Sequence, residues 1–307
     1  MNIMVTGTSG FIGSHLHSLY PDVLKTFRSK DDSNIDYSSQ SVIIVPNITG
    51  VTNWSGKLLD VDVIIHLAGL AHSNSYTIEN YQSVNVDGSL HFASEAAKAG
   101  VKRFVFVSSI AVNGTKTNQL SFSTTSDVNP HNAFAQSKYD AEVGLKRIAE
   151  ETGLEVVIVR PTLVYGLNAP GNFGSLTKLV KKFPFLPFGL SDNKRDFIAV
   201  QNLADLLITC ANHPNAAGQT FLASDGETVS IKVFTNAIAK GLNKTLIQLP
   251  VPISLMRLGA RLVGKLSIAE QLLGNLQVDS SNAHEVLGWS PPYTMEQAMA
   301  SLSERKK

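Results

Sequence analysis

The chain has 307 residues, of which 43% are hydrophobic, enough for a buried core in one large domain or two modest ones. Its 26 lysines and arginines nearly balance 25 aspartates and glutamates, and the net charge of +1 excludes a general electrostatic attraction to nucleic acid or anionic lipid. A single cysteine excludes an internal disulfide, no apolar run approaches the roughly 18 residues of a membrane span, and no signal peptide pattern opens the chain, so a cytoplasmic location is expected.

Apolar runs of strand length alternate with helical patterns through the first half of the chain. The runs are nearly continuous, as expected of parallel strands that helices cover on both faces. Strands are predicted at 2–6, 23–27, 42–46, 62–67, 102–108 and 155–160. Helices are predicted at 11–20, 78–99 and 131–152, with Gly153 ending the last. This order indicates an α/β protein with a doubly wound parallel sheet of the Rossmann type.

The alternation stops at 161–190, where glycine and proline are crowded. A strand–helix piece follows at 195–212, and a mostly helical tail comes after it. We therefore predict a dinucleotide-binding domain and a smaller, mostly helical substrate lobe. The domain would comprise 1–165 plus 195–212, and the lobe 166–194 plus 213–307.

A glycine-rich loop with the sequence VTGTSGFIG joins the first predicted strand to the first predicted helix. Gly7, Gly10 and Gly13 permit a tight turn and the close approach of a pyrophosphate, and a helix N-terminus offers amide donors to it. We expect these glycines, with Phe11 and Ile12, to contact a dinucleotide. The alternative is a glycine turn that binds nothing.

Seven short motifs follow one another in a characteristic order. They are TGTSGFIG (6–13), IIHLAG (64–69), VNVDGS (84–89), VFVSSIAVNG (105–114), SKYDAE (137–142), VIVRPTLVYG (157–166) and RDFIAVQNLAD (195–205). In this order and spacing the chain resembles the extended short-chain dehydrogenase/reductase family, and most closely its nucleotide-sugar 4-epimerase and 4-ketoreductase branch. The resemblance covers nearly the whole chain.

The resemblance implies a cofactor site at the ends of the first strands. Leu67, Ala68 and Gly69 would lie against the dinucleotide, and Asn47 falls where the family usually has an aspartate near the adenine. NAD enzymes usually place an acidic residue at the end of the second strand, but here Arg28 could pair with the 2′-phosphate of NADP or be a solvated surface residue. We expect NAD or NADP, with NAD favoured because the epimerases that the chain resembles retain it.

In the family, a helix carries Tyr-x-x-x-Lys beside a catalytic serine or threonine. The tyrosine exchanges a proton with the sugar hydroxyl, and the lysine holds the nicotinamide ribose and lowers the pKa of the tyrosine. Lys138 occupies the lysine position and Ser109 the serine position, but Phe134 stands in the tyrosine position. Tyr139 cannot substitute, since one residue along a helix turns the side chain by about 100°, and Tyr165 belongs to another segment.

A positioned acid–base group contributes about 10²–10⁴-fold in rate, so the chain is expected to be impaired by Phe134. Three explanations are open: an engineered tyrosine-to-phenylalanine variant, a natural homologue with another proton path, or a non-catalytic binder. The otherwise complete set of family residues favours the first.

The family also implies where a sugar nucleotide would bind. Asn172 in the sequence GNFG and Arg195 in KRDF would contact the diphosphate, and Phe188 would wall the uracil or simply pack. Eight scattered histidines and one cysteine suggest no metal site. The predicted helices 78–99 and 131–152 resemble the pair that forms a four-helix bundle in family dimers, so a homodimer is expected.

One helical stretch near the C-terminus combines basic and leucine-rich positions. Arg257, Arg261 and Lys265 lie four residues apart within 253–273. This stripe could rest on an anionic membrane, but a surface helix packed on the lobe is the preferred interpretation.

The sequence thus predicts NAD(P)-dependent chemistry at C4 of a UDP-hexose or UDP-N-acetylhexosamine, most simply 4-epimerisation. The alternatives are an NADPH-dependent 4-ketoreductase that makes a UDP-6-deoxy-hexosamine and a non-catalytic dinucleotide-binding regulator.

Overall fold

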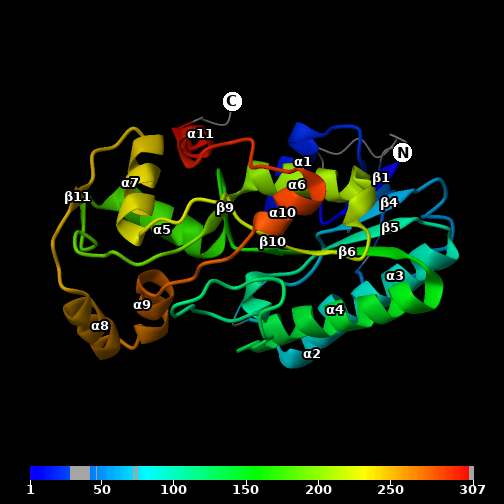
Figure 1. The fold of residues 1–307 in the computed structure, drawn as a ribbon, viewed down its shortest axis with the longest axis horizontal. Coiled ribbons are helices and arrows are strands. Elements are labelled where there is room, and N and C mark those ends of the chain that lie inside the picture. The colour runs from blue at the N-terminus through cyan, green and yellow to red at the C-terminus, as the bar shows by residue number, and fades with distance from the viewer. Residues whose placement is uncertain (28–41, 46, 72, 74, 304–307) are drawn as a thin grey trace.

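The computed structural model describes residues 1–27, 42–45, 47–71, 73 and 75–303. A seven-stranded sheet, parallel throughout, crosses the first lobe in the order β10-β6-β5-β4-β1-β2-β3 (Figure 1). Its strands are β1 (Ile3–Thr6), β2 (Leu24–Phe27), β3 (Val42–Ile44), β4 (Val63–His66), β5 (Arg103–Val107), β6 (Glu155–Pro161) and β10 (Thr220–Ala223). The predicted Rossmann-type fold is therefore confirmed.

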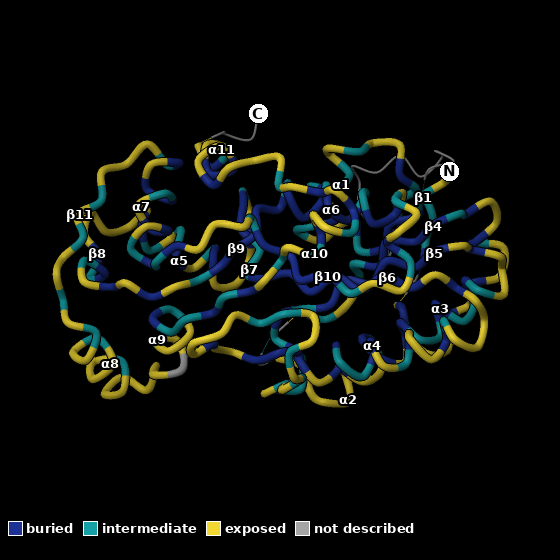
Figure 2. The backbone as a smooth tube through the Cα atoms, viewed as in Figure 1, coloured by how far each residue is buried: buried dark blue, intermediate teal, exposed yellow. Residues whose placement is uncertain are grey.

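Helices cover both faces of this sheet. One face carries α1 (Phe11–Leu19), α6 (Val200–Asn212) and α10 (Ser281–Leu287), and the other carries α3 (Ser89–Lys98) and α4 (Ala133–Thr152). Successive strand residues point to opposite faces, so Val5 joins the first core and Met4 the second, both fully buried. The central strands β1, β4, β5 and β6 are buried along almost their whole length (Figure 2), which explains their continuous apolar runs.

The predicted helix 78–99 is continuous but not uniformly α-helical. It consists of α2 (Ile78–Tyr81), the π-helix η1 (Gln82–Gly88) and α3. A Cβ on Gly88 would lie 2.8 Å from the carbonyl oxygen of Ile48, so the helix passes directly against the loop after β3. The side chain of Asn85 is bonded to Leu70 and to α4. These two attachments accompany the wider turn that the hydrophobic pattern did not predict.

The second lobe, which the sequence predicted as the substrate lobe, is mostly helical. It contains α5 (Gly171–Lys182), α7 (Ile231–Gly241), α8 (Ile253–Leu262), α9 (Leu266–Leu273), α11 (Met295–Ala300), and the strand pairs β8 (Phe185–Leu186) with β11 (Ile247–Gln248) and β7 (Leu163–Tyr165) with β9 (Phe197–Ala199). Three short 3₁₀ turns complete the described elements: η2 (Ile110–Val112), η3 (Pro214–Ala216) and η4 (Ser301–Ser303). The core of the lobe is aromatic, with the rings of Phe197 and Phe234 stacked at 3.8 Å.

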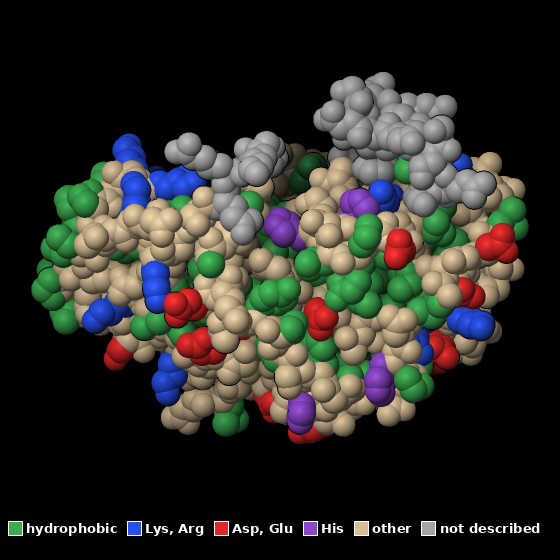
Figure 3. All heavy atoms as spheres, turned by 90° about the horizontal axis from the view of Figure 1, so that it is seen from above, with side chains coloured by type: hydrophobic (Ala, Val, Ile, Leu, Met, Phe, Trp, Pro, Cys, Tyr) green, Lys and Arg blue, Asp and Glu red, His purple; other side chains and the backbone are tan. Residues whose placement is uncertain are grey.

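The structure differs from the predicted division at more than one boundary. β7 and β9 fall within the predicted domain, yet Tyr165 and Phe197 join the core of the second lobe, whereas α10 falls within the predicted lobe and packs on the main sheet. β10 lies within 213–307, which the sequence pattern assigned to the lobe, yet it pairs with β6 at the edge of the main sheet. Its four residues form too short an apolar run to be distinguished from a lobe segment. Charged side chains of both signs are interspersed on the face seen in Figure 3, as the near-zero net charge leads one to expect.

Candidate active site

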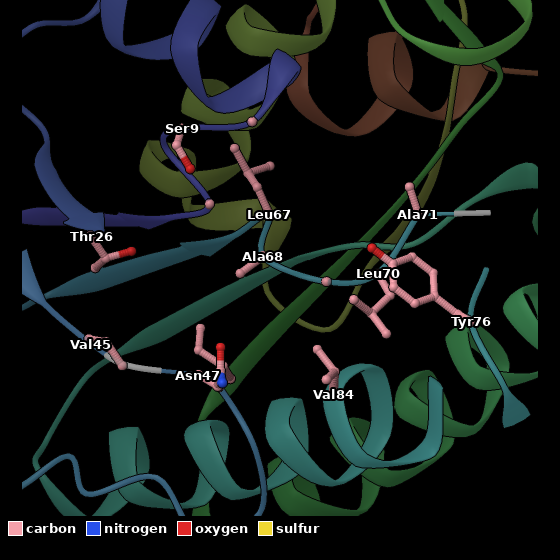
Figure 4. Close-up of a pocket in the computed structure, with 14 residues that line it drawn as sticks. Ser9, Thr26, Val45, Asn47, Leu67, Ala68, Leu70, Ala71, Tyr76 and Val84 are labelled. Carbon is pink, nitrogen blue, oxygen red and sulfur yellow. The ribbon is translucent and has the colours of Figure 1, made fainter. Parts of the chain in front are cut away.

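A cavity of about 360 Å³ opens at the carboxyl ends of the central strands. The chain leaves β1 toward β2 on one side, while β4 pairs with β1 on the other, and ligands of doubly wound sheets bind at such a switch point. Figure 4 shows the loop after β1, the ends of β2 and β3, and the loop after β4 surrounding this cavity.

The three glycines of the first loop are needed for different reasons. Gly7 has φ +75°, and a Cβ there would lie 2.8 Å from the amide of Ala68, while a Cβ on Gly13 would lie 2.3 Å from the carbonyl oxygen of Gly7. The fold itself therefore requires both glycines. Gly10 lines the cavity, and its Cβ would meet only the oxygen of Gly7, at 3.1 Å, so a side chain there would intrude mainly on a ligand.

The N-terminus of α1 has backbone amides that can donate hydrogen bonds to a ligand. Gly10 is the N-cap and no side chain caps the helix, so the first backbone amides, beginning at Phe11, have no intrahelical acceptor and can bind an anion. The side chains of Phe11 and Ile12 pack toward apolar cores, so any contact of these residues with a cofactor would come from the backbone.

The structure brings most of the predicted cofactor residues to this cavity. They are Gly7, Gly10, Asn47, Leu67, Ala68 and Gly69. Arg28 lies outside the described residues. The cavity wall also includes side chains that the motifs did not single out, among them Thr26, Val45, Leu70, Tyr76 and Val84 (Figure 4). Thr26 lies near the end of the second strand and could have been found by its position, whereas nothing in the sequence pointed to Tyr76.

Lys138 is buried beside this cavity, with 7% of its surface exposed. Its Nζ donates to the carbonyl oxygen of Val107 at 2.9 Å and lies 4.7 Å from the centre of the Phe106 ring. A Cβ on Gly69 would lie 3.5 Å from this Nζ, which places the amino group against the loop after β4. Burial lowers the pKa of Lys138 to about 8, and the charge of Glu142 opposes this shift.

Phe134 lies one helical turn before Lys138 on α4. Its ring makes an edge contact with Tyr81, with centroids 6.1 Å apart. The Tyr81 hydroxyl accepts from the amide of Ser73 at 3.0 Å and donates to the carbonyl of Ser73 or Ala71. This neighbouring phenol therefore holds the loop after β4, and its hydrogen bonds are committed to that loop.

Asn85 connects that loop to α4. Its Oδ1 accepts from the amide of Leu70 at 2.7 Å, and its Nδ2 donates to the carbonyl of Leu70 at 3.1 Å and to Ser137 Oγ at 3.0 Å. Ser137 in turn donates to the carbonyl of Phe134 at 2.8 Å. The asparagine thus fixes the distance between the cavity wall and the helix turn that carries Phe134 and Lys138.

Ser109 follows β5, the strand whose last carbonyl binds Lys138. It is the N-cap of η2, and its Oγ accepts from the amide of Ala111 at 3.2 Å. A hydroxyl that accepts one bond still has a proton to donate. Ser109 and Lys138 therefore lie at the same end of the same strand.

A buried ion pair between Arg160 and Glu142 lies next to Ser108, the residue before Ser109. Arg160 donates to Glu142 through Nε at 2.9 Å and Nη2 at 2.5 Å, and through Nη1 to Asn113 at 3.0 Å. Ser108 also donates to Glu142, and both ionised side chains are at most 5% exposed.

Tyr165 does not belong to this group of residues. It is fully buried, and its hydroxyl donates to Asp225 at 2.7 Å.

A second cavity, of about 40 Å³, lies in the substrate lobe and is lined by Asn172 and Arg195 with Gln271 and Leu272 of α9. Arg195 Nη1 donates to the carbonyl of Gly274 at 3.0 Å, and burial lowers its pKa to about 10. This volume holds at most a few water molecules, so the space inside the cavity is too small for a nucleotide unless the α9 wall moves.

Phe188 lies apart from this cavity wall. It is buried in the apolar core of the lobe, and its backbone forms an isolated antiparallel β-bridge with Pro250. Among the described residues there is no group of three or more histidine, cysteine or acidic side chains that could hold a metal ion. In the same part of the chain, no helix is long and apolar enough to cross a membrane.

Comparison with known proteins gives one family. Residues 3–224 match the NAD dependent epimerase/dehydratase family. The chain is 37% identical over 317 aligned residues to a UDP-glucose 4-epimerase of Vibrio cholerae, covering 99% of this chain and 94% of that protein.

Solved structures of distant relatives share the fold. A UDP-glucuronic acid 4-epimerase from Bacillus cereus in complex with NAD superimposes with a TM-score of 0.76 at 18% identity, covering 98% of this chain and 94% of that one. RMD from Pseudomonas aeruginosa complexed with NADPH gives 0.72 at 20% identity, covering 99% and 98%. At these low sequence identities, the similarity shows a shared fold and nothing more. The extent of the family match, together with the Vibrio cholerae relative, shows that the chain belongs to the NAD dependent epimerase/dehydratase family.

Proposed function

We propose that this chain is a nucleotide-sugar 4-epimerase for a UDP-hexose or UDP-N-acetylhexosamine, and that Phe134 impairs it. The observation that carries the proposal is the buried amino group of Lys138 at the edge of the dinucleotide cavity, one helical turn from Phe134 and at the same strand end as Ser109. The similarity to a UDP-glucose 4-epimerase over nearly the whole chain supports the same assignment.

The residues of the first lobe would hold the cofactor. Bound NAD(P) would supply hydride acceptance and return at C4 of the sugar. The amides at the start of α1 would bind its pyrophosphate, and Asn47 would lie near the adenine. Leu67, Ala68 and Gly69 would line the cofactor, and Lys138 would hold the ribose next to the nicotinamide.

Substrate would be held by the second lobe and by the end of β5. Ser109 would donate to the reacting hydroxyl, and Asn172 and Arg195 would bind the diphosphate after α9 moved aside. The group missing from this arrangement is the acid–base hydroxyl at position 134. In its absence Lys138 can position a ribose, but no phenol stands between it and the sugar.

Restoring the hydroxyl tests the proposal. Phe134→Tyr places a phenol one turn from Lys138, whose charge would lower the pKa of that phenol. Turnover of UDP-galactose or UDP-N-acetylgalactosamine should rise by at least about 10²-fold. Adding Lys138→Met should remove most of the gain, whereas Tyr139→Phe, on another face of the same helix, should leave it intact.

The same coupled assay distinguishes the alternatives. Turnover of only a UDP-4-keto-6-deoxy sugar with consumption of NADPH would replace the epimerase by a 4-ketoreductase. Phe134 itself is the observation that favours a non-catalytic regulator, and this alternative would gain if restored tyrosine gave no turnover although NAD(P) and UDP still bound. The homodimer and the cytoplasmic location stay predictions, and sedimentation velocity tests the first.

A further inference from the structure

The helices α8 and α9 form a hairpin at the far end of the substrate lobe, and this hairpin exposes large hydrophobic side chains. None of the ten residues of α8 is buried, and the tube in Figure 2 is drawn as exposed along most of that helix. The exposed fractions are Leu255 56%, Leu258 53%, Leu262 80%, Val263 67%, Leu266 39% and Ile268 50%. The hairpin does pack on the lobe, as the sequence led us to prefer, but it leaves these large apolar side chains uncovered.

Helical spacing separates the faces of α8. Ile253 and Met256 pack against the core of the lobe. Leu255, Leu258 and Leu262, spaced by three and four residues, share a different face that points away from it. A contiguous apolar surface of this kind on a globular lobe marks an interaction site.

Basic side chains lie next to that face. Between 253 and 273 the chain has Arg257, Arg261 and Lys265 against a single acidic residue, Glu270, for a local net charge of +2. Arg257 is paired with Glu270 at 2.8 Å. Arg261 and Lys265 are exposed and have no carboxylate within 4 Å among the residues described here.

We propose that the α8–α9 hairpin docks on an anionic lipid membrane. The leucine face would enter the boundary between headgroups and acyl chains, and Arg261 and Lys265 would extend to the anionic headgroups beside it. A second copy of the chain fits this surface less well. A two-fold contact through the same face would place Arg261 and Lys265 of both copies close together, and like charges would oppose it.

The location adds a consequence for the second cavity. Gln271 and Leu272, on the second helix of the docking hairpin, form one wall of the cavity that Arg195 and Asn172 line. A membrane docked on the hairpin would therefore lie next to the wall that must move before a nucleotide enters. This consequence alone rests on the proposed function; docking itself does not.

Vesicle flotation of the full chain tests docking directly. The chain should float with vesicles of phosphatidylcholine and phosphatidylglycerol, and much less with phosphatidylcholine alone. Arg261→Gln with Lys265→Gln should reduce partitioning onto the anionic vesicles by about 25-fold, or about fivefold for each charge. Leu258→Ser with Leu262→Ser should reduce it at least about tenfold on both kinds of vesicle.

Matched controls lie at the opposite end of the molecule, before β4 and β5. Leu59 is 75% exposed and Lys102 is also exposed. Leu59→Ser therefore removes an exposed leucine side chain, and Lys102→Gln an exposed positive charge, from another surface, and both variants should float with vesicles as the wild type does. All variants should keep the wild-type melting temperature, since the changed side chains are exposed.

Three results would overturn the proposal. They are the absence of flotation, equal flotation on neutral and anionic vesicles, and equal losses in the controls. A dimer in sedimentation velocity that Leu258→Ser with Leu262→Ser dissociates, without loss of flotation, would assign the surface to self-association instead.

Discussion

Removing the arginine of the buried ion pair should be among the most destabilising single changes in the first lobe. Arg160→Met leaves Glu142 buried with Ser108 as its one remaining side-chain partner among the described residues, and leaves the Oδ1 of Asn113 without Arg160, its donor in the structure. Breaking a buried pair by removing one partner costs about 3–5 kcal/mol. For a domain of 150–250 residues, about 2–4 °C is lost per kcal/mol, so the melting temperature should fall by roughly 6–20 °C.

The magnitude depends on the charge left behind, so a double variant isolates it. Arg160→Met with Glu142→Met removes both charges and leaves Ser108 and Asn113 as the orphaned polar groups, at about 1–3 kcal/mol. The double variant should therefore be more stable than the single one. Lys240→Met, which breaks an exposed pair with Glu296, is the matched control and should cost about 0–1 kcal/mol.

Urea unfolding followed by tryptophan fluorescence measures this loss in the lobe concerned. Trp54 and Trp289 are the two tryptophans of the chain, and both are buried against the main sheet, so the signal reports the first lobe. If Arg160→Met lowered the midpoint no more than Lys240→Met, or if the double variant were the less stable, the pair would not be a desolvated ion pair and the reasoning would fail.

Gly10→Val should abolish NAD(P) binding in calorimetry while the chain still folds, and unchanged affinity in the folded variant would contradict the cofactor site. Gly13→Val should fail to fold, because only a Cβ on Gly13 would overlap the backbone. Arg195→Ala should weaken binding of UDP by about 1.5–3 kcal/mol without changing NAD(P) affinity, and an equal loss for both ligands would remove Arg195 from the sugar-nucleotide site. The pKa of Lys138 is about 8 in the folded chain against an ordinary 10.5, so at this group the unfolded chain binds more protons between these values. Lys138 should therefore make the free energy of unfolding rise with pH from about 8 to 10, and the raised pKa of Cys210 opposes this rise above about pH 9. Urea unfolding of Lys138→Met without cofactor should lack that rise.

Much of the fold could be predicted because buried parallel strands leave a strong pattern. All six predicted strands occur within two residues of their predicted bounds, and Gly153 ends α4 with φ +79° as a left-handed residue. The family assignment and the cofactor class, NAD or NADP, are likewise confirmed. The strand β10 was missed because four apolar residues between turns are too few to show a period.

The position of a residue could be predicted where a motif forces one residue type: Gly7 and Gly10 line the cavity and Lys138 lies beside it, while their contacts with a ligand stay predictions. It was not predictable where contact depends on tertiary structure. Tyr76 reaches the cavity only because α2 is attached to the loop after β4, and Phe188, an aromatic in a proline-rich loop, turned inward to the lobe core. The exposed face of α8 was also unforeseen, since a helical pattern does not show whether its apolar side is covered.

The π-helical turn η1 makes this site sensitive to chain length as well as to side-chain identity. A wide turn accommodates a residue that an α-helix of the same rise would not, so loss of one residue from 82–88 could be absorbed locally by an ordinary α-helical turn. The preceding segment would then rotate by about 100° relative to α3. Tyr81 would leave Phe134 and release the loop that it holds, even if the residue lost were not Val84 and so did not line the cavity.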